Sequence, residues 1–379
     1  MDLEKRKLQE TKKKISLQKS YIVLKNNNNT NKPIKTAILS FGMSGKVFHA
    51  PFIHHHEKFE LAGIVERSKN EATVIYPNTK IYKTIDSVLA DESIELIVVN
   101  TPTYTHFEFA KKALEKGKHI VVEKAFTTTA EEAKILTDLA IEKELVLSVY
   151  QNRRWDSDFS TVKQIVDNQK VGTVISAEFH FDRFKEAISP KIHKESPNAG
   201  AGLLLDLGPH LIDQAVYLFG MPQAVMADIR TVRSNSLVDD EFTIILYYTQ
   251  LRVTLKSSLM VKEPLPAYII HGKKGSFIKT RADIQEAALI HNAIPYTENW
   301  GQEPTTAMGY LHTEINGQTI KEYVPSLRGN YGAFYDGLYN TIINKAPCLV
   351  GGQDGLNVMK LIEAAKESHV TGKIIQINP

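Results

Sequence analysis

The chain has 379 residues, of which 42% are hydrophobic and 23% charged, and its formal net charge is +3. This length predicts two domains, and no apolar run approaches the roughly 20 residues of a membrane helix, so a membrane is not an expected partner. A single cysteine excludes an internal disulfide and favours a reducing, cytoplasmic location.

Residues 1–32 differ in charge from the rest of the chain. They hold nine of the 46 Lys and Arg residues but only three of the 43 Asp and Glu residues, and a run of four asparagines lies near their end. The segment lacks the continuous apolar core of a signal peptide, and we expect a disordered leader. The remainder is slightly acidic and shows no basic stripe, so nucleic acid is not an expected partner.

Between residues 34 and 150, short apolar runs alternate with amphipathic segments. The expected strands span residues 34–40, 59–66, 80–82, 95–100, 119–123 and 145–150. The expected helices span a segment that ends at residue 56 and residues 69–75, 85–90, 106–116 and 130–143. This alternation is typical of a parallel sheet with helices on both faces. We therefore predict a Rossmann-like dinucleotide-binding domain over residues 33–151.

The turn after the first strand reads SFGMSGKVFH over residues 40–49. Against the dinucleotide fingerprint G-x-G-x-x-G, Ser40 replaces the first glycine, whereas Gly42 and Gly45 keep the second and third. Free N–H groups at the start of the next helix attract phosphates. We expect the pyrophosphate of a dinucleotide to lie against Ser40, Gly42, Met43, Ser44 and Gly45.

The end of the second strand bears on the choice of cofactor. Glu66 stands where a carboxylate accepts the hydroxyls of the adenosine ribose, which favours NAD. Arg67 follows it and could bind a 2′-phosphate, so NADP stays the alternative. Three consecutive histidines at 54–56 point about 100° apart on a helix and cannot converge on one ion, so no metal site is predicted.

After residue 150 the pattern changes to longer strands joined by turns. The expected strands lie within residues 171–184, 241–249, 252–260, 267–280 and 313–324. The expected helices span residues 203–219, 333–344 and 353–367. We predict that residues 152–379 form an α+β domain with a large, mostly antiparallel open sheet, in a protein of the α/β class. One uncovered sheet face predicts a homodimer or homotetramer.

Asp206 and His210 are four positions apart within the expected helix 203–219, among several leucines. At this spacing two helical side chains share a face. Such a pair is either a buried, hydrogen-bonded structural pair or part of an active site. The local sequence leaves both interpretations open.

Five motifs, in this order along the chain, resemble those of the Gfo/Idh/MocA oxidoreductases, the group of glucose–fructose oxidoreductase and inositol dehydrogenase. They are SFGMSGKVFHAPF (40–52), NTPTYTH (100–106), EKAF (123–126), VYQNRRWDSDF (149–159) and GAGLLLDLGPHLID (200–213). The resemblance extends from residue 34 to the C-terminus. It implies hydride transfer between a nicotinamide cofactor, NAD or NADP, and a secondary alcohol of a sugar or cyclic polyol.

The resemblance implies catalytic roles for Lys124, Asp206 and His210. His210, with an ordinary pKa near neutral pH, would take the proton of the substrate hydroxyl. Lys124 would stabilise the developing alkoxide, and Asp206 would orient the imidazole or the substrate. Ala125 stands where the family motif has a proline, so the fixed φ of that residue is lost.

The resemblance also implies contacts around the nicotinamide and the substrate. The residues expected beside the nicotinamide and its ribose are Thr101, Pro102, His106, Glu123, Gln151 and Asn152. The residues expected on the substrate side are Arg153, Trp155, Arg183 and Tyr331. Trp155 could instead pack at a hinge, Arg183 could be a surface charge of the sheet, and Tyr331 could belong to a helix core.

Two other functions stay open at this point. The fold could serve a sensor that binds the cofactor without turnover, although Lys124, Asp206 and His210 are all present. It could also serve an NAD-dependent enzyme that processes glycosides through transient oxidation, although the leader does not look like a secretion signal. The sequence does not identify the sugar, the oxidised carbon or the direction of the reaction.

Overall fold

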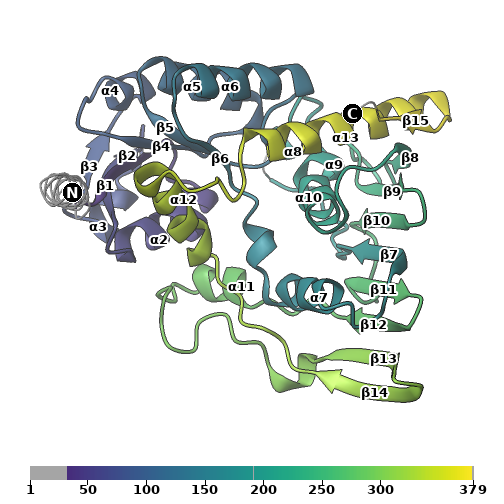
Figure 1. Cartoon of the computed structure of the whole chain (residues 1–379). Helices are drawn as coiled ribbons and strands as arrows, with labels where there is room; N and C mark the ends of the chain where they lie inside the picture. The colour runs from purple at the N-terminus through teal and green to yellow at the C-terminus, as the bar shows by residue number, and fades with distance from the viewer. Residues whose placement is uncertain (1–31, 191, 378–379) are drawn as a thin grey trace, which may run out of the picture.

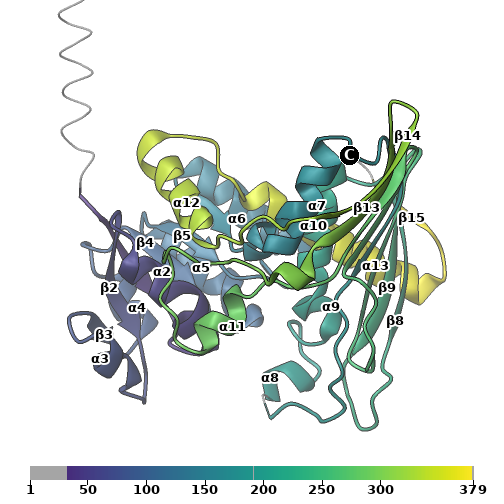
Figure 2. The same ribbon diagram turned by 90° about the horizontal axis from the view of Figure 1, so that it is seen from below.

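The structure is a computed structural model that describes residues 32–190 and 192–377, without the side chains of residues 192 and 193. The predicted leader, residues 1–32, lies outside this range apart from its last residue. Two β-sheets lie side by side, and Figures 1 and 2 show helices packed between them. The predicted α/β class, with one parallel and one mostly antiparallel sheet, is confirmed.

The first sheet has six parallel strands in the order β3-β2-β1-β4-β5-β6. The strands are β1 (Ile34–Ile38), β2 (Phe59–Val65), β3 (Lys80–Tyr82), β4 (Leu96–Val99), β5 (His119–Val122) and β6 (Leu147–Val149). All four residues of β4 are buried because helices cover both faces. The strand order reverses between β1 and β4, where open α/β sheets form a crevice at their carboxyl ends.

Helices connect these strands and cover both faces of the first sheet (Figure 1). They are the single-turn π-helix η1 (Gly45–His49), α2 (Ala50–His55), α3 (Glu71–Ile75), α4 (Ile85–Leu89), the 3-10 turn η2 (Thr103–Thr105), α5 (His106–Glu115) and α6 (Ala130–Glu142). Thr84 and Thr129 begin α4 and α6, since each hydroxyl accepts a hydrogen bond from a backbone N–H of the first turn.

The second sheet has nine strands in the order β14-β13-β12-β11-β7-β10-β9-β8-β15. They are β7 (Val174–His180), β8 (Ala224–Arg230), β9 (Glu241–Tyr247), β10 (Arg252–Ser258), β11 (Tyr268–Gly272), β12 (Gly275–Lys279), β13 (Gly309–Ile315), β14 (Gln318–Val324) and β15 (Ile375–Gln376). All neighbouring pairs are antiparallel except β7 and β10. The sequence did not predict β8 and β15, the two strands at one edge.

The remaining helices lie on the inner face of the second sheet or at the junction with the first (Figure 2). They are η3 (Asn152–Trp155), α7 (Ser157–Asp167), α8 (Ile192–Glu195), α9 (Leu203–Asp206), α10 (Gly208–Phe219), α11 (Gln285–Ile290), η4 (Thr305–Ala307), α12 (Gly332–Asn344) and α13 (Gly352–Thr371). None of the described helices is both long and apolar enough to cross a bilayer.

Two of these helices tie the halves together. Helix α13 packs against both α6 and β8, and so touches each half of the chain. On α12, the Tyr335 ring stacks on Phe52 of α2, with centroids 5.8 Å apart. The core is therefore shared across the junction, and the crevice of the first sheet faces the second half.

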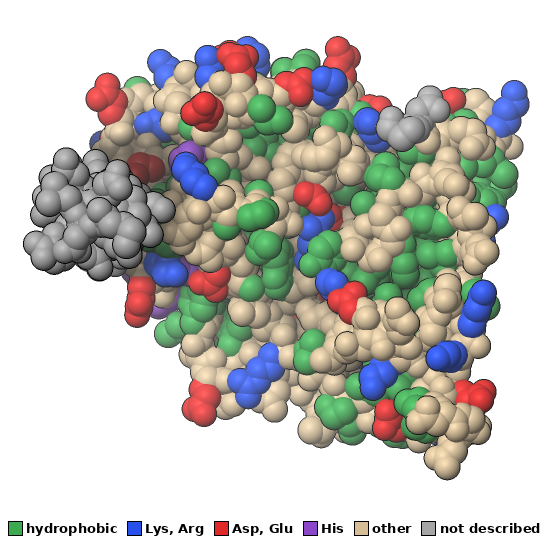
Figure 3. All heavy atoms as spheres, in the orientation of Figure 1, with side chains coloured by type: hydrophobic (Ala, Val, Ile, Leu, Met, Phe, Trp, Pro, Cys, Tyr) green, Lys and Arg blue, Asp and Glu red, His purple; other side chains and the backbone are tan. Residues whose placement is uncertain are grey.

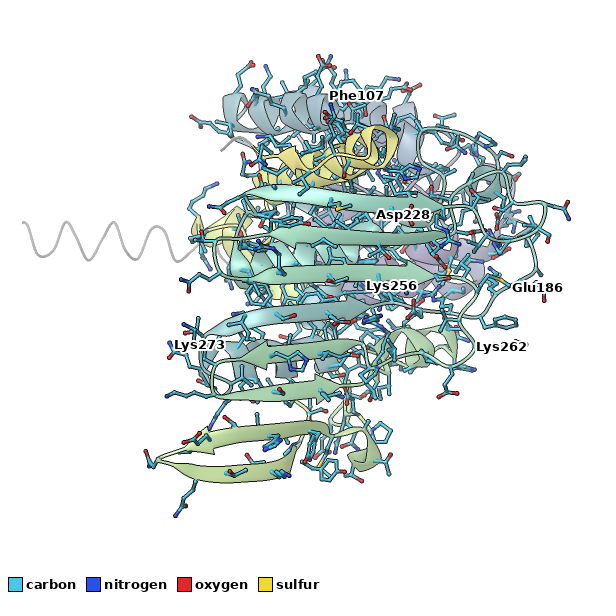
Figure 4. The ribbon with its side chains drawn as sticks, turned by 90° about the vertical axis from the view of Figure 1, so that its right-hand side faces the viewer. Phe107, Glu186, Asp228, Lys256, Lys262 and Lys273 are labelled. Carbon is cyan, nitrogen blue, oxygen red and sulfur yellow. The ribbon has the colours of Figure 1, made fainter. Side chains whose placement is uncertain are left out.

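No helix of the described residues lies over the outer face of the second sheet (Figure 4). In β9, Phe242, Ile244 and Leu246 are buried toward the helices, whereas the alternating residues are only half-buried. Outward residues include Asp228 and Lys256 as well as isoleucines, so this face mixes polar and apolar side chains. In Figure 3, the described basic and acidic side chains of the face shown are interspersed and form no stripe of one sign.

Candidate active site

A pocket of about 610 Å³ opens between the two halves, at the carboxyl ends of the first sheet. Its first wall is lined by residues within segments 40–48 and 100–104 and by residues 123, 124 and 150, which follow β1, β4, β5 and β6. Its second wall is lined by residues within segments 183–189 and 194–202, by α9 and the start of α10, and by residues of segments 152–153 and 233–239 and at position 286. The predicted site residues on these walls are Ser40, Gly42, Met43, Ser44, Thr101, Pro102, Glu123, Lys124, Asn152, Arg153, Arg183, Asp206 and His210.

The turn after β1 is held by Asn100 at the end of β4. The Asn100 side chain accepts a hydrogen bond from the Ser40 N–H at 2.9 Å and donates one to the Ser40 carbonyl oxygen at 2.8 Å. The Ser40 hydroxyl in turn accepts from the Gly42 N–H at 3.3 Å. The serine that replaces the first fingerprint glycine thus fixes the turn. A Cβ at Gly45 would collide with the Ser40 carbonyl oxygen, so the helix start packs directly on the strand end.

Glu123 lies at the end of β5 inside a buried hydrogen-bond network. Its Oε1 atom accepts from the Ser44 hydroxyl at 2.5 Å and lies 3.1 Å from Nε2 of His49. The other ring nitrogen of His49 lies 2.8 Å from the Tyr335 hydroxyl. Burial by itself would raise the pKa of Glu123, but His49, Ser44 and the charge of Lys124 outweigh it and lower the pKa to about 2. Glu123 is therefore ionised at the floor of the pocket.

Lys124 crosses the pocket from the first wall to the second. Its Nζ donates to the Asp206 backbone oxygen at 2.6 Å and to Asp206 Oδ1 at 3.1 Å. Lys194 also donates to both oxygens of the same carboxylate, at 3.0 and 3.1 Å. Burial would raise the pKa of Asp206, but the two ammonium groups hold it well below its usual range. Asp206 is thus an anion shared by two cations.

The structure corrects the expected continuous helix 203–219. It is broken at Leu207, so Asp206 ends α9 and His210 lies in the first turn of α10. Pro209, which has no N–H, fits the first turn of the new helix. Among the described residues, Asp206 pairs with the two lysines and makes no hydrogen bond to His210. The premise of one shared helical face was wrong, although both side chains still line the same pocket.

His210 is buried, and its Nδ1 atom has no hydrogen-bond partner among the described residues. Burial lowers its pKa well below the ordinary value, and the charges of Lys124 and Arg153 lower it further. This differs from the expectation of a pKa near neutral pH. The imidazole is therefore neutral at pH 7, and a neutral imidazole is the form that accepts a proton.

Several predicted residues are absent from the pocket lining. Both Glu66 oxygens accept backbone N–H bonds at the start of α3, from residues 71 and 72, and the side chain is 6% exposed. Arg67 is exposed at the surface. The ring nitrogens of His106 lie 2.9 and 2.8 Å from the carbonyl oxygens of Ala125 and Thr101, so His106 joins the loops after β5 and β4. Burial lowers its pKa.

Three further predicted residues are also absent from the pocket lining. Gln151 is buried, and its Oε1 atom has no partner within the described part of the chain. The Trp155 ring packs edge-on against Phe334. Tyr331 is fully buried and donates to Asp156 at 2.7 Å, so it belongs to the core of the junction.

Sequence reasoning missed three residues that organise the pocket. His49 lies within the quoted motif SFGMSGKVFHAPF, and Asn100 directly follows β4, so each carried a local signal. Lys194 lies in the short helix α8, and nothing in the neighbouring sequence marks it as a partner of Asp206.

The first wall fits a dinucleotide. Close packing at Gly45 brings the start of η1 onto β1, so the backbone of residues 42–44 borders the pocket. The residues that would hold the cofactor are Ser40, Gly42, Met43, Ser44, Thr101, Pro102, Glu123 and Asn152.

Comparisons with known proteins agree with this arrangement. Residues 34–151 match the profile of the oxidoreductase family's NAD-binding Rossmann fold, and residues 163–377 match the C-terminal alpha/beta domain of the same family, GFO_IDH_MocA. The chain is 35% identical over 344 residues to scyllo-inositol 2-dehydrogenase (NADP(+)) IolW of Bacillus subtilis, covering 91% of this chain and 96% of that one.

Two further relatives extend the comparison. Glucose-6-phosphate 3-dehydrogenase of Bacillus subtilis is 28% identical over 222 residues, which cover 56% of this chain and 62% of that protein. The crystal structure of an oxidoreductase from Bacteroides fragilis superposes with a TM-score of 0.84 at 45% identity, covering 91% of this chain and all of the other.

Proposed function

Because the chain belongs to the Gfo/Idh/MocA oxidoreductase family, an NAD(P)-binding group that oxidises and reduces CH–OH groups, we propose that it is a dehydrogenase of a sugar or cyclic polyol. The observation that carries the proposal is the convergence of Lys124, Asp206 and His210 on one pocket, opposite the glycine turn. The names of the inositol and glucose 6-phosphate dehydrogenases support the substrate class.

When bound, the nicotinamide would accept or supply the hydride. The chain's own task is then to move the hydroxyl proton and to stabilise the oxygen. His210 takes the proton, because its neutral form prevails at pH 7 and the residue lines the pocket. Its low pKa makes it a weak base for an ordinary alcohol. A second group must therefore favour the alkoxide.

Lys124 is that group. Its ammonium reaches across the pocket to Asp206, and an alkoxide near Nζ would receive a charge-assisted hydrogen bond. Asp206 keeps Lys124 extended across the pocket and, with Lys194, holds the second wall in place. Asp206 thus positions the lysine, where the sequence had suggested that it orients the imidazole or the substrate.

Both NAD and NADP remain within the proposed function. The Glu66 carboxylate already accepts two backbone N–H bonds from the start of α3. These hydrogen bonds reduce its repulsion of a 2′-phosphate. Arg67 stands exposed next to it. The relative IolW is named as NADP-dependent. We propose that NADP is accepted as well as NAD, which weakens the preference for NAD expected from Glu66 alone.

The assembly and compartment follow as parts of the same proposal. The uncovered outer face of the second sheet supports pairing with a second copy, and light scattering that gives a monomer of about 43 kDa at micromolar concentration would reject it. The single cysteine among 379 residues supports the cytoplasm.

The test is reduction of NAD or NADP by the purified protein with a panel of inositols, aldoses and sugar acids. Turnover of a member of the panel, lost in His210→Ala with an unchanged melting temperature, is the expected result. Cofactor binding without turnover of any member would favour the sensor instead.

A further inference from the structure

We propose that the substrate carries an anionic oxygen group, a carboxylate or a phosphate, in addition to its hydroxyls. Arg183, with Lys185 beside it, binds that group. The inference deepens the proposed function and rests on it, because it takes the pocket to hold a hydroxyl-bearing substrate.

The backbone fixes where these two cations lie. Beyond β7, the Arg183 N–H donates to the Ser258 carbonyl oxygen at 2.9 Å and the Lys185 N–H donates to Leu259 at 2.7 Å, so the segment extends the sheet. In extended backbone, alternate residues face the same side. Arg183 and Lys185 both line the pocket, whereas Phe184 between them stands outside its lining. The sheet thus puts both cations at the border of the pocket, where they stay exposed to solvent.

Three guanidinium groups gather at one aromatic ring. The guanidinium carbons of Arg153, Arg183 and Arg281 lie 4.9, 4.9 and 3.9 Å from the centroid of Phe181. No two of them can be more than about 10 Å apart. Stacking on a ring leaves the donor edge of a guanidinium free and already oriented. Such an edge matches the two oxygens of a carboxylate or phosphate.

Two of these three guanidinium groups lie within ion-pair distance of carboxylates, and Arg183 does not. Arg153 pairs with Glu286 at 2.6 Å and with Asp156 at 3.2 Å, and Arg281 lies 3.8 Å from the same Asp156. Arg183 and Lys185 form no ion pair with any residue whose side chain the structure describes. A cation stacked at a pocket wall without a counter-charge is a site prepared for an anion.

The other carboxylates of the pocket are already engaged. Glu195 pairs with Arg233 at 2.9 Å, and Asp206 serves two lysines. Asp239 accepts the Leu204 N–H at 2.6 Å, and Glu123 belongs to the His49 network. None of them can neutralise Arg183 without giving up a present partner.

Charges of both signs surround Arg183. Burial and neighbouring Arg153 lower its pKa, whereas Asp206 and Glu286 act in the opposite direction. These two carboxylates already have cationic partners in Lys124, Lys194 and Arg153. A neutral sugar would leave Arg183 and Lys185 without a counter-charge, whereas an anionic one would pair with them in the pocket that His210 also lines.

The experiment compares three probes of one ring: glucose, glucuronate and glucose 6-phosphate. Each is titrated by calorimetry into wild type, Arg183→Gln and Lys262→Gln, all with saturating oxidised cofactor. We expect at least one anionic probe to bind wild type about tenfold more tightly than glucose, and Arg183→Gln to reduce that ratio by about tenfold. The probe that shows the preference identifies the group as carboxylate or phosphate.

Lys262→Gln is the matched control. Lys262 contacts Phe184 at 4.6 Å, lies outside the pocket lining and is labelled in Figure 4. It should keep the wild-type ratio. Equal binding of all three probes, including no binding, overturns the proposal, as does a ratio that Arg183→Gln leaves unchanged.

Two further readouts separate the remaining explanations. Titration of the cofactor alone identifies a role of Arg183 at the pyrophosphate, because the loss would then appear without any probe and would overturn the proposal. Turnover is scored separately. Preferred binding of an anion without hydride transfer would count against the proposed function and leave this inference standing, whereas oxidation of neutral sugars without anion preference would do the reverse.

Discussion

The two walls of the pocket are built in different ways. The first wall presents backbone, mostly uncharged side chains and one pair of adjacent charged residues, Glu123 and Lys124, and internal hydrogen bonds such as those of Asn100 fix its shape. The second wall presents long charged side chains, several of them between β7 and α9, which neutralise one another only in part. A wall of fixed shape suits a ligand that never changes, whereas a wall of charges suits selection among substrates.

The largest expected effect is on kcat, and it concerns Lys124 of the first wall and His210 of the second. Lys124→Ala and His210→Ala should each lower kcat by about 10²-fold or more, because each removes a group that moves the proton or stabilises the alkoxide. Titration of the dinucleotide should show little change, since neither substitution alters the turn at residues 40–45. The exposed Lys116→Ala and His291→Ala are matched controls. Full turnover by folded His210→Ala would show that the residue has only a structural role and would contradict the proposed mechanism.

The first wall can be tested through its shape. Asn100→Ala leaves the Ser40 N–H and carbonyl without their partners, and we expect a loss of about 2 kcal/mol in the free energy of unfolding. Dinucleotide affinity should fall by about tenfold because the turn is no longer fixed. Chemical denaturation and fluorescence titration measure the two effects, with the exposed Asn344→Ala as control. If affinity holds while stability falls, the turn's shape is not what binds the cofactor.

The charges of the second wall should appear in the pH profile. The Asp206 charge raises the pKa of His210, whereas Lys124 lowers it. Protonated His210 cannot accept a proton, so the acid limb of kcat/KM for alcohol oxidation follows this pKa. Asp206→Asn should move the limb to lower pH by roughly half a unit to one unit. Lys124→Ala should move it to higher pH in its residual activity. Shifts of the same sign in both variants would contradict the assignment.

The smallest effect concerns the adenosine end. Arg67→Ala should weaken NADP about threefold and leave NAD almost unchanged, since an exposed charge pair contributes little. The measurement is the ratio of kcat/KM for the two cofactors, with Lys83→Ala, another exposed cation of the same half, as control. A larger loss for NAD than for NADP would show that Arg67 does not meet a 2′-phosphate.

The sequence predicted those structural features that depend on residues close together in the chain. Strand and helix rhythm predicted the first sheet because each element reports its own burial, and β3 falls on residues 80–82 as expected. The edge strand β15 has two residues and pairs only with β8, so it left no pattern to recognise. The motifs also selected Lys124, Asp206 and His210 as candidates, and all three line one pocket.

The sequence could not predict the contacts that those residues make. The break at Leu207, the pairing of Lys194 with Asp206 and the turning of Glu66 toward α3 depend on segments distant in sequence or on backbone choices that periodicity cannot register. The roles expected for the individual site residues remain predictions that the variants above address.

Two adjacent residues at the end of β5 contact different halves of the chain. Glu123 accepts a hydrogen bond from Ser44 and lies beside His49, both in the first half, whereas Lys124 donates to Asp206 in the second half. The two contacts therefore meet at one peptide bond inside the pocket. Any rearrangement that separated Lys124 from Asp206 would displace the group that stabilises the alkoxide in the proposed mechanism, while the contacts of Glu123 lie wholly within the first half.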